Sequence, residues 1–246
     1  MSLRAVEKRS LPDKVFEQLT AEIVSGRYAP GAAIPSEREL SDTLAVNRHV
    51  VREAVKRLEQ VGLVKVVQGG RTTVLDFRQT AGLDLLALVA EHADANALEE
   101  LPALLVGALE MRAGIGVDVA RLCAPRAGAA VGGELLALSD TLAATRTGEE
   151  LLALDQRFWQ LMLDGADNLA YQLAFNSLIR AVHALRELSV PWLEQELERG
   201  EYRRPIAIAI AAGDAQSAAG ATRAALTPPA DHPLLAAAAR GAGATR

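Results

Sequence analysis

The sequence predicts a mainly α-helical protein with one small β-hairpin, built as an N-terminal head and a C-terminal all-α bundle. Between Pro35 and Leu75, capped helices alternate with turn signals and end in two β-branched runs. From Leu83 to Leu226, nearly every segment is rich in Ala and Leu, with hardly any strand-like alternation. We therefore expect a head at residues 1–76, a linker at 77–82, a bundle at 83–228 and a disordered tail at 229–246.

The first two helices of the head are predicted from apolar spacing and capping residues. The first runs from Leu11 to Ser25 and is expected to support the other two. The second starts after Ser36, whose hydroxyl can accept a hydrogen bond from a free backbone amide. Glu39, three residues on, can reach back to the amide of Ser36 and complete a capping box.

The third helix, Arg48 to Val61, is predicted to have one apolar and one cationic face. Asn47 is a suitable cap before it, and Gly62 suits a left-handed stop after it. The apolar residues that recur at helical spacing and are expected to face inward are Val51, Ala54, Val55 and Leu58. The opposite face carries Arg48, Arg52 and Lys56, with His49 beside the first.

Two β-branched runs follow, Leu63 to Val67 and Arg71 to Leu75, joined by the turn Gln68-Gly69-Gly70. A helix, a sharp turn, a second helix and a glycine-tipped hairpin make a winged helix-turn-helix, in which the start of the second helix reaches base edges. The alternative is a three-helix core with a solvated basic face. The order of the elements, with caps and stops at each junction, favours DNA binding.

Several separate blocks of the head resemble the DNA-binding signature of the GntR family of bacterial transcription regulators. These blocks are Pro35-Ser36-Glu37-Arg38-Glu39-Leu40, Asn47-Arg48, Val51-Arg52-Glu53-Ala54 and Leu58, within a match over residues 11 to 76. The resemblance implies DNA contacts from Arg38, Asn47, Arg48, His49 and Arg52, and minor-groove entry by Gly69. Lys56, on the same helix face, and Gln68, beside the wing tip, complete the candidate set.

The formal net charge of −5 is divided unevenly along the chain. Residues 1 to 78 hold 13 Lys or Arg and 10 Asp or Glu, a net charge of +3, so the remainder carries −8. A modestly basic module joined to an acidic one suits a regulator that contacts DNA at one end. Because each protomer offers few cations, useful affinity is expected to need a homodimer on a palindromic operator.

Composition also indicates the compartment. No apolar run reaches the roughly 18 residues needed to cross a bilayer. There is no charged-then-apolar leader with a cleavage site, so we expect a cytoplasmic protein without a membrane partner. The single cysteine, Cys123, cannot form an internal disulfide, which fits a reducing compartment, and its expected role is a small buried side chain.

Six or seven helices are predicted in the bundle from the helix breaks between Leu83 and Leu226. The predicted breaks fall near Asp94-Ala95, Ala124-Pro125, Thr147-Gly148, Gly165 to Asn168, Val190-Pro191 and Gly213-Asp214. A helical bundle attached to a winged helix is expected to sense a ligand and to mediate dimerisation. The arrangement resembles the FadR subfamily of GntR regulators over most of the chain.

Many relatives bind a divalent metal in the bundle through one Asp and three His. By resemblance, that Asp is Asp155, but Trp159 stands at the first His position, and Arg203 and Ala225 lie near the other two. Trp cannot ligate a metal and Arg brings a repelling charge, so we expect no metal cofactor. The one loophole is His183, which would be a weak lone ligand and is better explained as a structural residue.

The loss of the His positions is shared with the fatty acyl-CoA-responsive FadR proteins. This resemblance suggests an acyl-CoA, or another large and partly apolar effector such as an organic acid. Arg112 matches a position where an arginine can grip an anion, and an ion pair within the protein is the alternative. Asp155, Trp159 and Tyr171 are further effector-contact candidates, although structural roles are favoured for all three.

The sequence thus predicts an effector-controlled transcription regulator, with repression favoured only by family habit. No phosphate-binding Gly loop, nucleophile elbow or His-Glu-x-x-His helix is present, so an enzyme is not expected. Two rival hypotheses remain. One is a metal-assisted helical enzyme with a vestigial DNA-binding head, and the other is an architectural DNA binder without an effector.

Overall fold

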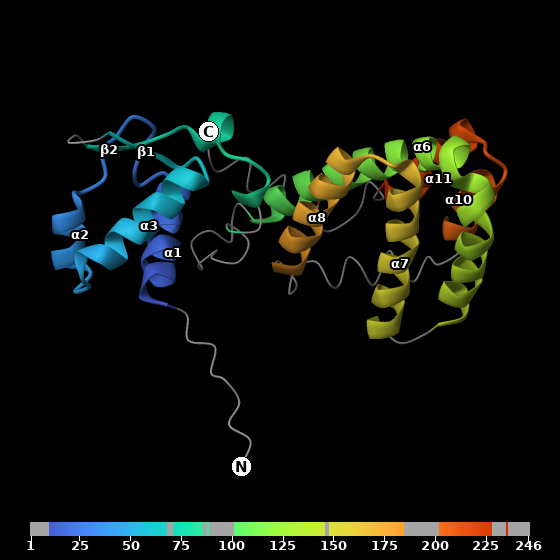
Figure 1. Cartoon of the computed structure of the whole chain (residues 1–246), viewed down its shortest axis with the longest axis horizontal. Coiled ribbons are helices and arrows are strands. Elements are labelled where there is room, and N and C mark those ends of the chain that lie inside the picture. The colour runs from blue at the N-terminus through green and yellow to red at the C-terminus, as the bar shows by residue number, and fades with distance from the viewer. Residues whose placement is uncertain are drawn as a thin grey trace, which may run out of the picture. The chain divides into compact units, whose positions relative to one another are not determined.

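The computed structural model describes residues 10–67, 71–85, 88, 101–145, 148–184, 202–227 and 235 (Figure 1). The chain divides into two compact units, Met1–Glu99 and Glu100–Arg246, and each is described by itself. Among the described residues, no helix is both long and apolar enough to cross a membrane. The boundaries predicted for the head, linker, bundle and tail stay predictions. Nearly all of the predicted tail lies outside the described residues.

The three predicted head helices are confirmed as α1 (Leu11–Val24), α2 (Glu37–Thr43) and α3 (Arg48–Gln60). The capping box of α2 forms as expected, since Ser36 Oγ accepts from the Glu39 amide at 3.3 Å and Glu39 Oε2 accepts from the Ser36 amide at 2.8 Å. Asn47 Oδ1 accepts from the Val50 amide at 3.0 Å and caps α3. These bonds satisfy amides that have no partner inside the helix.

The predicted hairpin is confirmed, with strands β1 (Val64–Val66) and β2 (Thr72–Val74) that pair antiparallel, Val64 opposite Val74. β2 has a second neighbour that the sequence did not indicate. The segment before α2 pairs with it through an isolated bridge between Ala33 and Thr73, and the Ile34 amide donates to the Thr72 carbonyl at 3.0 Å. This pairing ties the wing to the start of the helix-turn-helix.

The core of the head lies between α1, α3 and the hairpin. The inward residues of α3 are buried as predicted, and Val51, Ala54 and Leu58 have no exposed surface. Arg57 adds a polar link to α1, because its guanidinium lies 4.3 Å from the centre of the Phe16 ring and forms an ion pair with Asp13. Such stacking and pairing fix the position of α3 on α1.

The segment predicted as a linker is not plain coil, because Phe77–Thr80 forms the short helix α4. Asp76 caps it by accepting from the Arg78 amide. Thr80 Oγ1 donates to the Gly62 carbonyl at 2.7 Å, at the end of α3. Gly62 has φ +77°, and a Cβ there would lie 2.6 Å from the Thr80 carbonyl oxygen, so glycine is required on both grounds. Leu85 is also buried in the head core.

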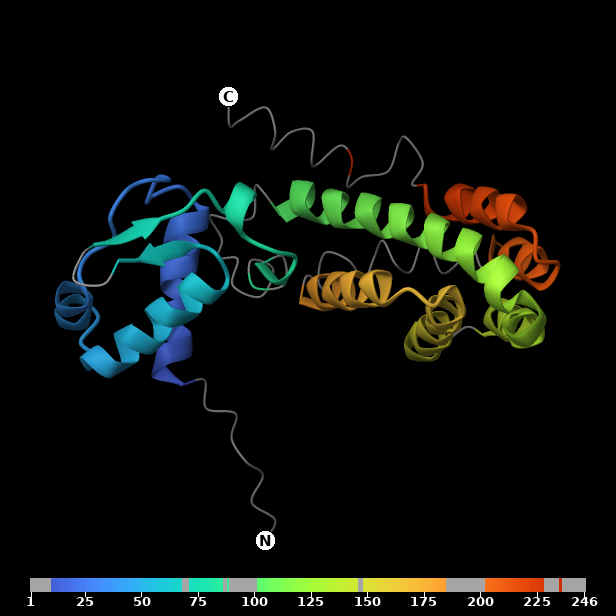
Figure 2. The same cartoon turned by 45° about the horizontal axis from the view of Figure 1, so that its top comes forward.

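The second unit is helical in its described part. Its described helices of five residues or more are α6 (Leu101–Ala144), α7 (Gly148–Ala166), α8 (Leu169–Ala184), α10 (Arg203–Ala211) and α11 (Ala215–Leu226). α6 packs against the other four, with α7 and α8 on one side of it and α11 on another (Figure 2). The predicted breaks between α6 and α7, α7 and α8, and α10 and α11 are confirmed. Those near residues 94 and 190, and part of the predicted total of six or seven helices, lie outside the described residues.

The predicted break at Ala124-Pro125 is wrong, because Pro125 lies inside α6. Proline removes one backbone hydrogen bond and crowds the preceding turn, which bends a helix without always ending it. Figures 1 and 2 show α6 changing direction along its length. The helix continues past the proline because its second half packs on α10. A Cβ at Gly128 would lie 2.1 Å from the Ile210 carbonyl oxygen, so the two backbones touch.

Neighbouring glycines in α6 provide a test of this close approach. A Cβ at Gly132 would lie 2.6 Å from Ala211 Cα, whereas Gly133 is exposed with nothing within 4 Å. We expect Gly132→Ala to lower the free energy of unfolding by about 1–3 kcal/mol through overpacking. Gly133→Ala should raise it by about 0.5–1 kcal/mol, because alanine favours the helix. Urea denaturation measures both, and equal effects would contradict the backbone contact between α6 and α10.

Candidate DNA-binding surface and buried charged cluster

The candidate DNA-contacting residues of α3 lie opposite its buried face. Asn47, Arg48, His49, Arg52 and Lys56 are all exposed. Residues 48, 52 and 56 are four apart, so they lie along one side of the helix. The amphipathic pattern of α3 therefore places a cationic ridge on the surface while the other side forms the core of the head.

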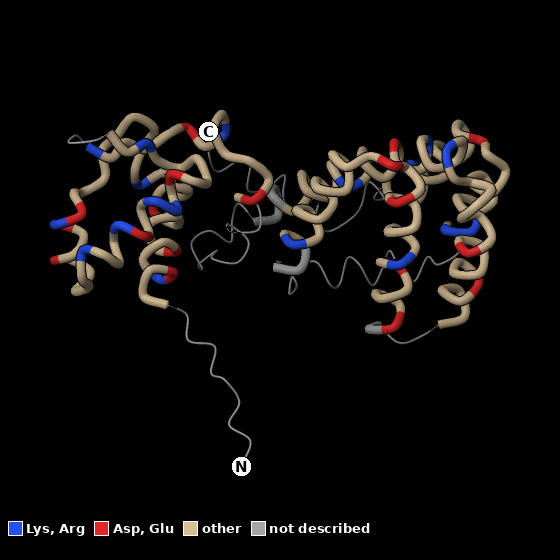
Figure 3. The backbone as a smooth tube through the Cα atoms, in the orientation of Figure 1, with Lys and Arg blue, Asp and Glu red and all other residues tan. Residues whose placement is uncertain are grey.

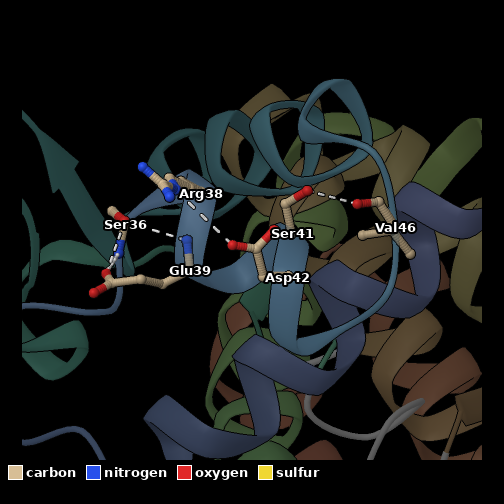
Figure 4. Close-up of polar contacts among 6 residues, drawn as sticks. All are labelled: Ser36, Arg38, Glu39, Ser41, Asp42 and Val46. Carbon is tan, nitrogen blue, oxygen red and sulfur yellow. Dashed lines mark hydrogen bonds and ion pairs between the residues drawn. The ribbon is translucent and has the colours of Figure 1, made fainter.

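The turn between α2 and α3 sets where this ridge lies. Ala45 has φ +51°, a left-handed conformation that costs roughly 1–2 kcal/mol for a residue with a Cβ. Ser41 stabilises the turn, since its hydroxyl donates to the Val46 carbonyl at 2.6 Å (Figure 4). Sequence reasoning identified the break at 45–47 but not the role of Ser41, because a serine inside a short helix carries no distinct signal.

Arg38 is exposed on α2, with its Nε 4.0 Å from an Asp42 carboxylate oxygen (Figure 4). The capping bonds that hold this helix also involve Glu39. The hydrogen bond from the Ser36 side chain, followed by that from its backbone amide, holds the pKa of Glu39 below its usual range. The carboxylate is therefore charged at neutral pH, and α2 presents Arg38 on a firmly capped helix.

The wing, which is the hairpin of β1 and β2, follows α3 in the sequence. The structure describes both of its strands. Gln68 and Gly69 fall outside the described residues, so their predicted DNA contacts stay predictions. Just before them, Val66 and Val67 are large apolar residues with 41% and 51% of their surface exposed. Glu59 of α3 accepts a hydrogen bond from the Val66 amide at 2.9 Å, which links α3 to the hairpin.

Carboxylates accompany the cations of this surface. Arg52 Nε lies 3.4 Å from Glu37 Oε2 on α2, and Lys56 Nζ lies 3.0 Å from Glu53 Oε1. Figure 3 shows acidic positions next to basic ones on both helices. Arg48 forms no ion pair with a described residue. The surface is therefore cationic at its ridge but only weakly so in total.

A buried ion pair joins α7 to α10 in the bundle. The Arg203 side chain has no exposed surface, and its Nε and one terminal amino group donate to Asp155 Oδ1 at 2.9 and 2.6 Å. The sequence alone could not predict that these two residues pair, because they are 48 positions apart. Sequence reasoning treated Arg203 only as a charge that would repel a metal.

Trp159 is one helical turn after Asp155 on α7 and lies next to a second buried arginine. The Arg112 guanidinium is 5.5 Å from the centre of the Trp159 ring, and 4% of Arg112 is exposed. A Cβ on Gly116, one turn after Arg112 on α6, would lie 2.9 Å from Leu226 and 3.1 Å from Trp159. Helices α6, α7 and α11 thus meet around the indole ring. We call Arg112, Asp155, Trp159, Arg203 and Thr222 the charged cluster.

Trp159 Nε1 and Thr222 Oγ1 belong to the charged cluster and have no hydrogen-bond partner among the described residues, and both residues are almost fully buried. Thr222 precedes Leu226 by one helical turn, so it faces the same side of α11. Buried donors without acceptors are costly, which makes these two groups suited to receive an acceptor from a ligand.

Tyr171, another effector candidate, instead links two helices. Its hydroxyl donates to Asp118 Oδ2 on α6 at 2.6 Å, and Arg121 pairs with the same carboxylate. The Arg121 hydrogen bond and then the Tyr171 bond hold the pKa of Asp118 below its usual range. The described contact of Tyr171 is therefore a structural one between α6 and α8. Cys123 is buried, as predicted, and burial raises its pKa to about 11.

Comparisons with known proteins match both units. The profile described as "Bacterial regulatory proteins, gntR family" matches residues 11–74, and that of the FCD domain matches residues 108–227. The HTH-type transcriptional regulator Mce2R of Mycobacterium tuberculosis is 36% identical over 218 residues, which cover 87% of this chain and 88% of Mce2R. The chain belongs to the GntR family. Its gntR head followed by an FCD domain is the arrangement of the FadR subfamily.

One further relative and one solved structure are similar to this chain. The fatty acid metabolism regulator protein of Serratia proteamaculans is 31% identical over 168 residues, covering 66% of this chain and 65% of that protein. A solved structure associated with Lar, which controls expression of the Listeria monocytogenes agr system, has a TM-score of 0.52 at 15% identity. It covers 96% of this chain and 99% of its own, and shows a common fold.

The side chains at the positions where many GntR relatives bind a metal do not fit an ion. Asp155 already accepts two hydrogen bonds from Arg203, Trp159 has no ligating atom, and Ala225 is apolar. No group of three or more His, Cys, Asp or Glu suited to a metal occurs within the described ranges, and the His183 side chain lies outside them. The absence of a metal cofactor stays a prediction.

The buried pair gives a test of what holds α7 to α10. Removing one partner leaves an uncompensated buried charge, so Asp155→Ala or Arg203→Ala should each lower the free energy of unfolding by about 3–5 kcal/mol. The double variant should cost less than the sum of the two, since it leaves neither charge behind. Chemical denaturation of the four proteins gives the coupling energy, and strict additivity would show that the residues do not interact.

Proposed function

We propose that this GntR-family transcription regulator is a homodimeric repressor that binds a palindromic operator and is released by an anionic, partly apolar effector. The observation that carries the effector proposal is the charged cluster. In it the Arg112 guanidinium lies against the Trp159 ring, the buried Arg203 pairs with Asp155 one turn earlier on α7, and two buried donors have no acceptor in the described part of the chain. A carboxylate or phosphate would supply acceptors to those donors and would place its negative charge beside Arg112.

An acyl-CoA or an organic acid has the required chemistry. Each joins an anionic group to an apolar part, and the charged cluster borders apolar residues such as Phe158 and Leu226. The name of the Serratia relative, a fatty acid metabolism regulator, supports a ligand derived from fatty acids. Repression is favoured by family habit, and release by the effector follows as its simplest control.

Dimeric binding is supported by the small number of cations on each head. The ridge of α3 offers Arg48, Arg52 and Lys56, two of which already have carboxylate neighbours. Two heads on two half-sites double the contacts and make a palindrome the matching DNA. Salt sensitivity should be modest, because the slope of affinity against salt follows the number of phosphates neutralised.

DNA contact by two of these arginines is the first prediction to test. Arg38→Ala and Arg52→Ala should each weaken operator binding by about 1–3 kcal/mol if the side chains contact bases or close phosphates. The probe is a duplex selected from a random pool by the full-length protein, and fluorescence anisotropy gives the affinity. Arg157→Ala is the matched control, since it removes an exposed arginine of the bundle that pairs with Glu134. Equal affinities for all four proteins would refute the assignment.

The effector site is tested through Arg112. Acyl-CoAs, organic acids and sugar acids are screened for a rise in melting temperature and for release of the selected duplex. Arg112→Gln should lose both responses, because the amide cannot pair with an anion. Tyr171→Phe should keep both, since its described contact is to Asp118. A wild-type protein that responds to no ligand would favour the effector-free architectural binder.

Elemental analysis of the purified protein separates regulation from the metal-assisted enzyme. Far less than one zinc, nickel or manganese per chain is expected, because Arg203 occupies the Asp155 carboxylate. A stoichiometric metal that survives dialysis would contradict this proposal and require other ligands.

A further inference from the structure

Glu37, a carboxylate residue on α2, contacts α3 beside the candidate base-reading residues. Glu37 Oε2 accepts a hydrogen bond from Arg52 Nε at 3.4 Å, across the turn between α2 and α3. Both side chains are partly exposed, Arg52 by 54% and Glu37 by 38%. The contact therefore lies on the surface that would face DNA and not in the core of the head.

Glu37 contacts Arg52 through Nε, and this determines which other groups of Arg52 can contact DNA. Only Nε donates to Glu37, and the terminal amino groups of Arg52 donate to no described residue. Those two groups form the planar fork that matches O6 and N7 of guanine. Because the arm is held at Nε, the fork remains available and fewer of its orientations have to be lost on binding.

The position of Glu37 is itself fixed by local structure. It is the first residue of α2, directly after Ser36, and the capping box from Ser36 to Glu39 holds that end of the helix. A carboxylate there also favours the helix terminus electrostatically, which is the structural explanation for the residue. That explanation accounts for a charge at position 37 but not for its contact with Arg52.

We infer that Glu37 is a positioning residue that orients Arg52 for base reading and raises the preference of the head for its operator over other DNA. This inference rests on the proposed operator binding. Glu37 raises this preference by keeping the arginine fork in one orientation. Its negative charge beside the ridge also weakens attraction to phosphates of any sequence, which lowers both affinities without changing their ratio.

The experiment measures the affinity for the selected duplex divided by the affinity for a scrambled duplex. Binding to the selected duplex and to a duplex of scrambled sequence is measured by anisotropy at the same salt concentration. Glu37→Ala should lower the ratio by about tenfold, with tighter binding to the scrambled duplex, because part of one bidentate contact is lost. Glu37→Gln keeps an acceptor for Nε, so it should retain most of the ratio.

Glu22→Ala is the matched control. It removes one carboxylate from the same head, but its partner is Arg27, at 3.0 Å after the end of α1. Its ratio should stay within about twofold of the wild type, since both duplexes gain equally from the lost charge. Melting temperatures of all variants show any structural cost separately, because a weaker α2 terminus lowers stability without selecting between sequences.

Two outcomes would overturn the inference. One is the same ratio in Glu37→Ala as in Glu22→Ala, and the other is an equal loss in Glu37→Gln and Glu37→Ala. Failure of the proposed function has a different signature, because the wild-type protein would then enrich no duplex from the random pool.

Discussion

Burial of one side of α3 is the constraint on which the DNA-binding surface depends. Val51, Ala54 and Leu58 are completely covered, and Arg57 stacks on Phe16 of α1. Because that side is fixed and the helix has 3.6 residues per turn, Arg48 and Arg52 must lie on the opposite, exposed side of α3. The hydrophobic core of the head thus determines which side of α3 carries the cationic ridge.

The bundle follows a different design, in which charge is enclosed by helices. Arg203 and Asp155 are buried together, and Arg112 lies against the Trp159 ring close by. A buried ion pair contributes little net stability compared with apolar packing, so its presence is better explained by specificity or ligand recognition.

Sequence reasoning succeeded where the physics is local. Ser36, Asn47 and Gly62 mark helix ends through bonds or dihedral angles within a few residues, so the elements of the head were predictable. It failed where distant segments decide. Pro125 indicated a break, but contact of the second half of α6 with α10 keeps the helix continuous. The partnership of Asp155 with Arg203 and that of Glu37 with Arg52 depend on the fold, and the sequence held no sign of either.

The bond from Thr80 to the Gly62 carbonyl has a mechanical consequence. The chain that follows the wing is attached to Gly62, directly after the C-cap of α3, and again to the head core through buried Leu85. A force applied to the chain at Thr80 would therefore act directly on the C-terminal end of α3.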